Sequence, residues 1–349
     1  NAILFLLAWE LMAVSSFFLV LFEGEKKESA KAGLIYLIAT HIGTIFLLVM
    51  FVLLGNSNNS FDFSEWNTVL TGFLPSLVFL FAVIGFGTKA GFMPMHIWLP
   101  EAHPAAPSHV SAIMSGVMIK TGIYGLLRII SFLPVPPPWW GYTLITLGIV
   151  SGVLGILFAL GQHDLKRLLA YSSIENVGII TIGLGLGIVG MSMNDPFITA
   201  VGLGGGLLHV VNHAIFKGLL FLEAGAVIQR TGTRSIDILG GLLKKMPVSG
   251  LCFLIGSAAI CGLPPLNGFM SEFLLYFVSI KNIFGSPQIV FVSTMVIAAL
   301  SVIGALAIVC FSKVFGIIFL GEPRSTLAHD VREPGIYMTF HFVILSAAC

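Results

Sequence analysis

Long apolar runs, each near the length that a membrane-spanning helix needs, follow one another along the whole chain of 349 residues. They fall at residues 2–22, 32–54, 70–90, 110–131, 142–160, 169–190, 197–222, 247–280, 289–319 and 336–349. Lipid cannot satisfy an open backbone, and the runs lack the alternation that is typical of β-barrel strands, so we expect them to be helical. The sequence therefore predicts an all-α polytopic membrane protein with about ten transmembrane helices of about 20 residues each.

The composition supports this class and excludes others. Only 9% of the residues are charged, whereas a soluble domain carries about 25%, and the mean hydropathy is +1.01. A net charge of +1 leaves no basic patch for a nucleic acid. The four cysteines form no CxxC pair, so the sequence gives no support for a disulfide, a zinc site or an iron–sulfur cluster. We expect no redox centre, cofactor or catalytic site on this chain.

Both ends of the sequence lie inside apolar runs. The chain begins at Asn1, without a methionine, and stops at Cys349. We therefore expect a fragment of a longer membrane protein. No basic segment or cleavage site accompanies the first run, which is interpreted as a span rather than a signal peptide.

Lysine and arginine gather in alternate loops. The loops at 23–31, 161–168, 223–246 and 320–335 hold Lys26, Lys27, Lys31, Lys166, Arg167, Arg230, Arg234, Lys244, Lys245, Arg324 and Arg332. The other side has only Arg128, near a helix end, and Lys281. The asymmetry fits the positive-inside rule and predicts that the basic loops are cytoplasmic.

Two lysines lie inside neighbouring apolar runs. Placing one lysine at the centre of a bilayer costs about 2.5–3.5 kcal/mol on insertion scales. Glycines and Pro94 surround Lys89, which predicts a broken or kinked helix of the kind that forms ion sites in transporters. Lys120 lies well inside the next run. We interpret both as stations for a moving proton, although Lys89 could also snorkel from a helix end.

Two glutamates also interrupt apolar runs. Glu10 lies about half-way along the first run and could be a partner that lowers the cost of a protonated Lys89. Glu175 lies in a similar position in a later run. The alternatives are a helix-end carboxylate for Glu10 and an inert, hydrogen-bonded carboxyl for Glu175.

His209, His213 and Lys217 recur at i, i+4 and i+8, which places them on one helical face. Imidazole titrates near physiological pH, so this stripe favours a proton relay. A His-xxx-His pair also suits zinc, but no third ligand of suitable spacing follows. Purely structural histidines are the other alternative.

Glu272 follows a second interruption, CGLPPLNGF, so the pattern of residues 85–94 recurs at 261–272. This predicts two inverted repeats, at 1–131 and 142–320, followed by a truncated helix at 336–349. An inert, hydrogen-bonded carboxyl is the alternative for Glu272, as it is for Glu175.

The connector at 92–109 carries His96, Glu101, His103 and His109. The sequence does not decide whether it is a solvated amphipathic loop or a part of the relay.

Several segments resemble one family of membrane proteins. They are KAGFMPMHIWLPEAHPAAPSHVSAIMSGVMIKTGIYG, HDLKRLLAYSSIENVG, HVVNHAIFKGLLFLEAGAV and GLPPLNGFMSEFLLY. These look like the antiporter-like membrane subunits of respiratory complex I and its relatives, with a strong likeness to the large membrane subunit of formate hydrogenlyase and hydrogenase-4 complexes. The resemblance implies a fourteen-helix fold, of which this chain covers the fifth helix to part of the last.

The resemblance also implies a mechanism, namely redox-driven proton translocation along buried charges. These would be Glu10 and Lys89 as a pair, Lys120 as a bridging lysine, His209, His213 and Lys217 as the central axis, and Glu272 as the terminal residue. It further implies partner subunits with a nickel–iron centre and iron–sulfur clusters, a peripheral hydrogenase or dehydrogenase arm, and a prokaryotic cytoplasmic membrane. Three alternatives remain: a quinone-linked complex I subunit, a multisubunit sodium–proton antiporter subunit, and a structural scaffold with inert charges.

Overall fold

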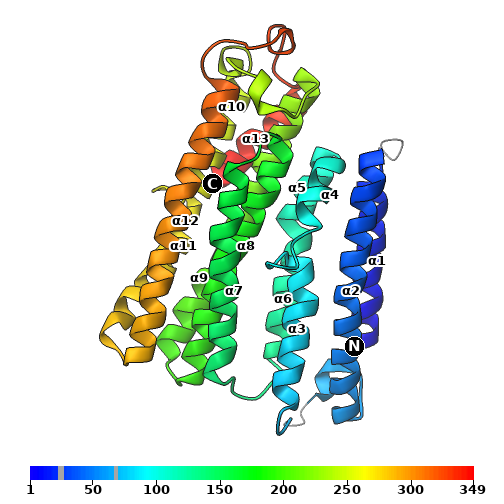
Figure 1. Ribbon diagram of the computed structural model, residues 1–349, viewed down its shortest axis with the longest axis vertical. Helices are drawn as coiled ribbons and strands as arrows, with labels where there is room; N and C mark the ends of the chain where they lie inside the picture. The colour runs from blue at the N-terminus through cyan, green and yellow to red at the C-terminus, as the bar shows by residue number, and fades with distance from the viewer. Residues whose placement is uncertain (23–26, 67–69) are drawn as a thin grey trace.

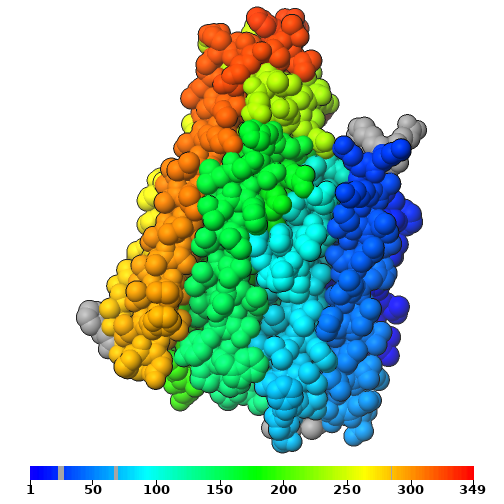
Figure 2. Space-filling model, viewed as in Figure 1, coloured from blue at the N-terminus to red at the C-terminus, as the bar shows by residue number. Residues whose placement is uncertain are grey.

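The computed structural model describes residues 1–22, 27–66 and 70–349, so Lys26 of the basic loops lies outside the described residues. Long helices run side by side along the vertical axis in Figure 1, and no β-strand occurs within the described ranges. In the space-filling view, the orange, green, cyan and blue segments lie next to one another in this order and are in direct contact (Figure 2). The expected all-α architecture is confirmed.

The first six helices form one side of the bundle. They are α1 (Ala2–Val20), α2 (Lys27–Asn58), α3 (Leu74–Ala90), α4 (Leu99–Ala105), α5 (Ser108–Ile113) and α6 (Ile119–Ile130). A π-helical turn, Met114–Met118, joins α5 and α6 into one span. The chain breaks between α3 and α4, where Gly91 adopts a left-handed conformation with φ +89° that favours glycine. The interruption predicted around Pro94 is therefore present.

The other helices are α7 (Pro138–Leu160), α8 (Leu165–Ser192), α9 (Pro196–Thr231), α10 (Pro247–Ile260), α11 (Asn267–Lys281), α12 (Pro287–Phe319) and α13 (Ile336–Ala348). The run at 247–280 divides into α10 and α11, as its glycines and prolines predict. Among the described residues, seven helices are long and apolar enough to cross a membrane, and α3, α10 and α13 are shorter apolar helices. The division into two inverted repeats stays a prediction.

Three predicted loops are partly helical: α2 already begins at Lys27 and α8 at Leu165, and the largest difference concerns the third loop. Residues 223–246 were expected to be a loop, but α9 continues through Glu223 and ends at Thr231. Gly232, with φ +70°, is the residue that terminates the helix. The polar residues after Leu222 therefore belong to a helix that is partly buried, and their polarity does not mark its end.

Helix α8 forms the centre of the bundle, because almost all of its residues are buried. It packs very closely on α7 through glycines. A Cβ atom added at Gly178 would lie 2.5 Å from the backbone nitrogen of Gly152, and one added at Gly155 would lie 2.7 Å from the nitrogen of Glu175. Small residues allow this approach in membrane bundles. The contact fixes the position of Glu175 in the interior.

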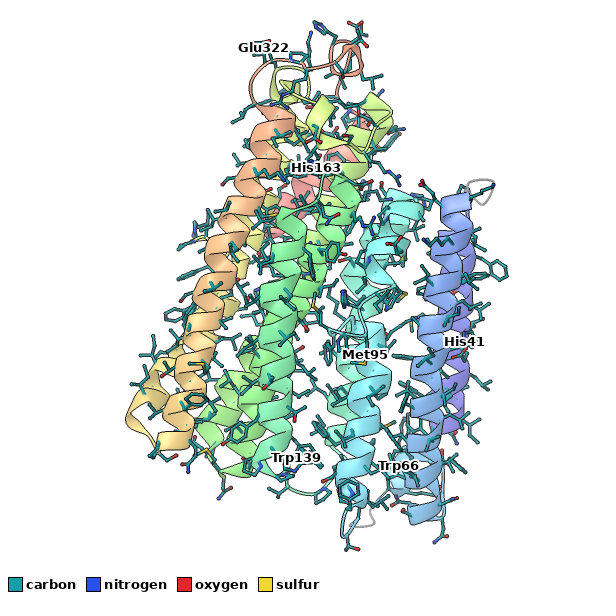
Figure 3. All side chains as sticks on the ribbon, in the orientation of Figure 1. His41, Trp66, Met95, Trp139, His163 and Glu322 are labelled. Carbon is teal, nitrogen blue, oxygen red and sulfur yellow. The ribbon has the colours of Figure 1, made fainter. Side chains whose placement is uncertain are left out.

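The described residues of the basic loops lie at one end of the bundle. Figure 3 shows His163 and Glu322 toward this end and Trp66 and Trp139 toward the other. Tryptophan is enriched at membrane interfaces. At the basic end, Lys244 Nζ lies 2.5 Å from Glu322 Oε1 and holds the pKa of that exposed carboxyl below its usual value. We call this the Lys/Arg-rich end.

Candidate functional site

Lys89 lies in the last turn of α3, beside the break, and is 2% exposed. Its Nζ donates a hydrogen bond of 3.0 Å to the hydroxyl of Tyr36 and lies 5.2 Å from the centre of that ring. The ring of Trp9 lies on another side, at 5.8 Å. An ammonium group enclosed by aromatic rings does not reach the interface, so Lys89 does not snorkel.

Glu10 is partly exposed on α1 and binds to α2. Its Oε1 accepts a hydrogen bond of 2.5 Å from Thr44, and its Oε2 lies 3.6 Å from His41 Nε2. Glu10 and Lys89 are near enough for their charges to interact, but they form no direct ion pair. His41 lies about half-way along α2, at nearly the height of Met95 in the break after α3 (Figure 3).

Lys120 is the second residue of α6, just after the π-helical turn. Its Nζ donates to the carbonyl oxygen of Ser115, which lies inside that turn. A π-helical turn leaves backbone carbonyls without their usual partners and is frequent at functional sites. The Ser115 hydroxyl lies 2.8 Å from the hydroxyl of Ser173 on α8, so this lysine is linked to the centre of the bundle.

The stripe on α9 is fully buried, as its three side chains are all 0% exposed. His209 has partners on both sides, with Nδ1 2.8 Å from Ser271 Oγ and Nε2 3.0 Å from Asn176 Oδ1. The ring of His213 is parallel to that of His209, at 6.5 Å between centres, and neither of its nitrogens has a hydrogen-bond partner.

Lys217 completes this stripe and binds to α8. Its Nζ donates to the carbonyl of Leu169, at 2.9 Å, and to the hydroxyl of Ser172. Glu175 follows on the same helix, is 0% exposed and has no hydrogen bond to either carboxyl oxygen. Its charge and that of Lys217 lie close enough to interact. The structure does not show the hydrogen bonds that the structural alternative for Glu175 supposes, and a role of Glu175 in a relay stays a prediction.

Glu272 lies on α11 against the second break. A Cβ atom added at Gly262 would lie 2.8 Å from Glu272 Oε2, so the carboxyl fills the space that this glycine leaves. Gly262 also has φ +62°, a conformation that favours glycine. Each break therefore has one ionisable side chain beside it, Lys89 at the first and Glu272 at the second.

The position of His103 shows where part of the connector at 92–109 lies. This histidine is 0% exposed on α4, its ring stacks on Phe221 at 4.8 Å, and both ring nitrogens lack a partner. The charges of Lys120, Lys166 and Lys217 all act on it. For His103, a solvated loop position is wrong, because α4 turns this side chain into the interior between α8 and α9.

A polar cavity of about 960 Å³ opens at the Lys/Arg-rich end, between α2, α4, α5, α8 and α9. Its lining includes Glu101, Pro104, Lys166 and Arg167. Lys166 was predicted to lie in a loop, but it is in the first turn of α8, is 3% exposed, and donates from Nζ to the carbonyl of Ala106. The cavity thus brings solvent to the segment that carries His103.

The family model described as NADH:quinone oxidoreductase/Mrp antiporter, transmembrane domain, matches residues 1–301. The chain belongs to this family. It is 44% identical to hydrogenase-4 component B of Escherichia coli (strain K12) and 37% identical to formate hydrogenlyase subunit 3 of the same strain, over 100% of this chain in both cases. These alignments cover 52% and 57% of the relatives, so the chain spans about half their length.

The solved structures that resemble this antiporter-family chain include the membrane-bound sulfane sulfur reductase, an archaeal respiratory membrane complex. The TM-score is 0.83 at 27% identity, and the match covers 99% of this chain and 55% of the other. The chain is therefore a multi-pass integral membrane domain of a family whose members include subunits of large membrane complexes.

The sequence did not predict that two residues of this antiporter-family domain are buried, namely His103 and Lys166. The available signal was the segment LPEAHPA, whose Pro100 suits the first turn of a helix and which could have indicated a short second half of a broken helix. The sequence does not show how deeply these two side chains are buried. Among the described residues, no group of three His, Cys, Asp or Glu side chains could hold a metal ion.

Proposed function

We propose that this chain is the proton-translocating membrane subunit of a redox-driven complex similar to hydrogenase-4 or formate hydrogenlyase. The observation that carries the proposal is a series of ionisable side chains in a membrane domain, all of them buried except Glu10 and Glu272, which are partly buried. The series comprises Glu10, Lys89, Lys120, Glu175, His209, His213, Lys217 and Glu272. Ionisable groups at such depth are expensive and mark proton pathways in pumps.

Coupling along this series would be electrostatic. A protonated Lys89 repels a second positive charge nearby, so a change of its charge alters proton binding at Lys120 and then along the α9 stripe. The ring centres of His209 and His213 are 6.5 Å apart, which is too far for direct transfer and requires a bridging water. Electron transfer would occur on nickel–iron and iron–sulfur centres in partner subunits, in a prokaryotic cytoplasmic membrane.

The cavity at the Lys/Arg-rich end supports a route by which protons reach the series. Water in the cavity has access to Lys166, and His103 lies near enough to Lys166, Lys120 and Lys217 for their charges to act on it. A neutral imidazole accepts a proton at one nitrogen and releases it from the other. His103 therefore has the position and the chemistry of an inlet group.

Replacing His103 with leucine is expected to lower the rate of proton translocation by about a hundredfold, because leucine keeps the packing on Phe221 but carries no proton. The rate is measured as acidification or alkalinisation in proteoliposomes that contain the whole complex. His163→Leu is the control, since His163 is exposed and pairs with Asp237. Equal translocation by the His103→Leu complex and the wild type would remove His103 from the route.

The proposed function is tested by purifying the complex through a tag on this chain and reconstituting it in vesicles. We expect hydrogenase subunits to copurify, and a proton gradient to form only when electrons are supplied. Copurification of quinone-reducing subunits would assign the chain to a complex I-like enzyme instead. Sodium–proton exchange without any electron donor would assign it to an antiporter, and electron transfer without ion movement would indicate a scaffold.

A further inference from the structure

Glu223 is a buried carboxyl group that the predicted relay does not use. It lies on α9, six residues after Lys217, and is 0% exposed. Neither of its carboxyl oxygens has a hydrogen-bond partner. An ionised carboxylate in such a position loses its hydration without compensation, whereas a protonated carboxyl loses much less. The burial therefore favours a side chain that holds a proton.

The surroundings of Glu223 connect it to the surface. The hydroxyl of Ser249, in the first turn of α10, lies beside the Glu223 carboxyl without forming a hydrogen bond to it, and Ser249 is itself 0% exposed. Ser249 directs its own hydrogen bond, of 2.8 Å, to Oε2 of Glu333. Glu333 is half-buried in the loop before α13 and reaches the Lys/Arg-rich end. The hydroxyl thus lies between an enclosed acid and one that water can reach.

Glu333 is held firmly in this position. Its Oε1 accepts hydrogen bonds from the backbone nitrogens of Val248, at 2.7 Å, and Ser249, at 3.2 Å, which caps the N-terminus of α10. Arg230 of α9 binds the backbone carbonyl of Glu333, at 2.9 Å. The Cys252 thiol of α10 also lies near both carboxyl groups. Glu223 forms no ion pair within the described part of the chain.

We propose that Glu223 is a proton-exchange site that communicates with water at the Lys/Arg-rich end through Ser249 and Glu333. In the release step, the protonated Glu223 carboxyl first turns to donate a hydrogen bond to Ser249 Oγ. Its proton then passes to that oxygen while the Ser249 hydroxyl proton passes to Glu333 Oε2. The net change is one proton moved and one negative charge transferred from Glu333 to Glu223. Glu333 then releases the proton to water, and the reverse sequence reloads Glu223. This inference stands independently of the proposed function.

The alternatives are a structural acid and a cation site. A structural carboxyl would be expected to use its oxygens in hydrogen bonds, because leaving one buried acceptor unpaired costs about 1–3 kcal/mol. A cation would need more oxygen ligands than Glu223 and Ser249 supply, and Glu333 is committed to the backbone of α10. A proton is the ligand that fits a carboxyl with a single hydroxyl neighbour.

The test is infrared difference spectroscopy on the complete purified protein, recorded in H₂O and after transfer to D₂O without any electron donor. We expect a carbonyl stretching band of a protonated carboxyl that shifts in D₂O and is absent from Glu223→Gln. Ser249→Ala should keep this band and slow its exchange by about tenfold or more. Ser257→Ala is the matched control, because Ser257 is also buried on α10 and unpaired.

Two results would overturn the inference. One is the absence of any band that Glu223→Gln removes, which would show an ionised or inert side chain. The other is equal exchange in Ser249→Ala and Ser257→Ala, which would show that the route does not pass through Ser249. If Glu223→Gln does not fold, the exchange rates of the two serine variants still decide. A failure of redox-driven translocation would not affect these spectra, so the two proposals fail separately.

Discussion

Replacing Lys120 with methionine is expected to abolish redox-driven proton translocation while the complex still assembles. Lys120 lies between the first break and the α9 stripe, and its Nζ has the Ser115 carbonyl as its hydrogen-bond partner. Methionine has a similar length and no charge. Removing a buried cation leaves one carbonyl unpaired but also removes the cost of burying the charge, so folding should change little. The defect should therefore appear in transport.

The measurement compares proton movement with electron transfer in the same proteoliposomes. We expect the translocation rate to fall by at least about a hundredfold, as for the loss of a positioned proton-transfer group. Lys281→Met is the matched control, because Lys281 lies at the opposite end of the bundle and contacts the ring of Phe197. Unchanged translocation by Lys120→Met would support a scaffold with inert charges and would contradict the relay.

The helical architecture was predictable because the hydropathy of each short stretch of sequence is enough to indicate a membrane-spanning helix. Apolar runs must be helical in lipid, and glycines and prolines at 85–94 and 261–268 indicate where two helices break. The burial of Lys89 beside a broken helix follows from the same local signals. The structure confirms both breaks and places Lys89 and Glu272 next to them.

Other parts of the site depend on contacts between distant segments and were not predictable. His103 lies inside the bundle because α4 packs against α8 and because its ring stacks on that of Phe221 of α9. The sequence predicts a loop at Glu223, because the apolar run ends at residue 222, whereas α9 continues for two more turns. Glu10 was expected beside Lys89, but its carboxylate binds Thr44 and approaches His41. The spacing of residues along the sequence does not determine which partners these side chains contact.

Replacing Gly178 with leucine is expected to prevent the domain from folding. The α7–α8 contact is so close that a Cβ atom at residue 178 would lie 2.5 Å from the nitrogen of Gly152 and 2.6 Å from the carbonyl of Gly148. Both atoms belong to the backbone and cannot rotate away. Overpacking a core costs about 1–3 kcal/mol when side chains can adjust, and here two helices would have to separate. We expect a loss of about 3 kcal/mol or more.

Thermal unfolding and the yield of monodisperse protein in detergent measure this effect, with Gly178→Ala as a smaller step in the same direction. Gly204→Leu is the control, because a Cβ atom there meets nothing within 4 Å and the residue is exposed on α9. Equal stability of the two leucine variants would show that the α7–α8 contact is looser than described. Because Gly155 lets α7 approach the backbone of Glu175 in the same seam, separation of α7 and α8 would also displace that buried acid from Lys217. The glycines that stabilise the bundle therefore also hold the acid in its place within the buried series.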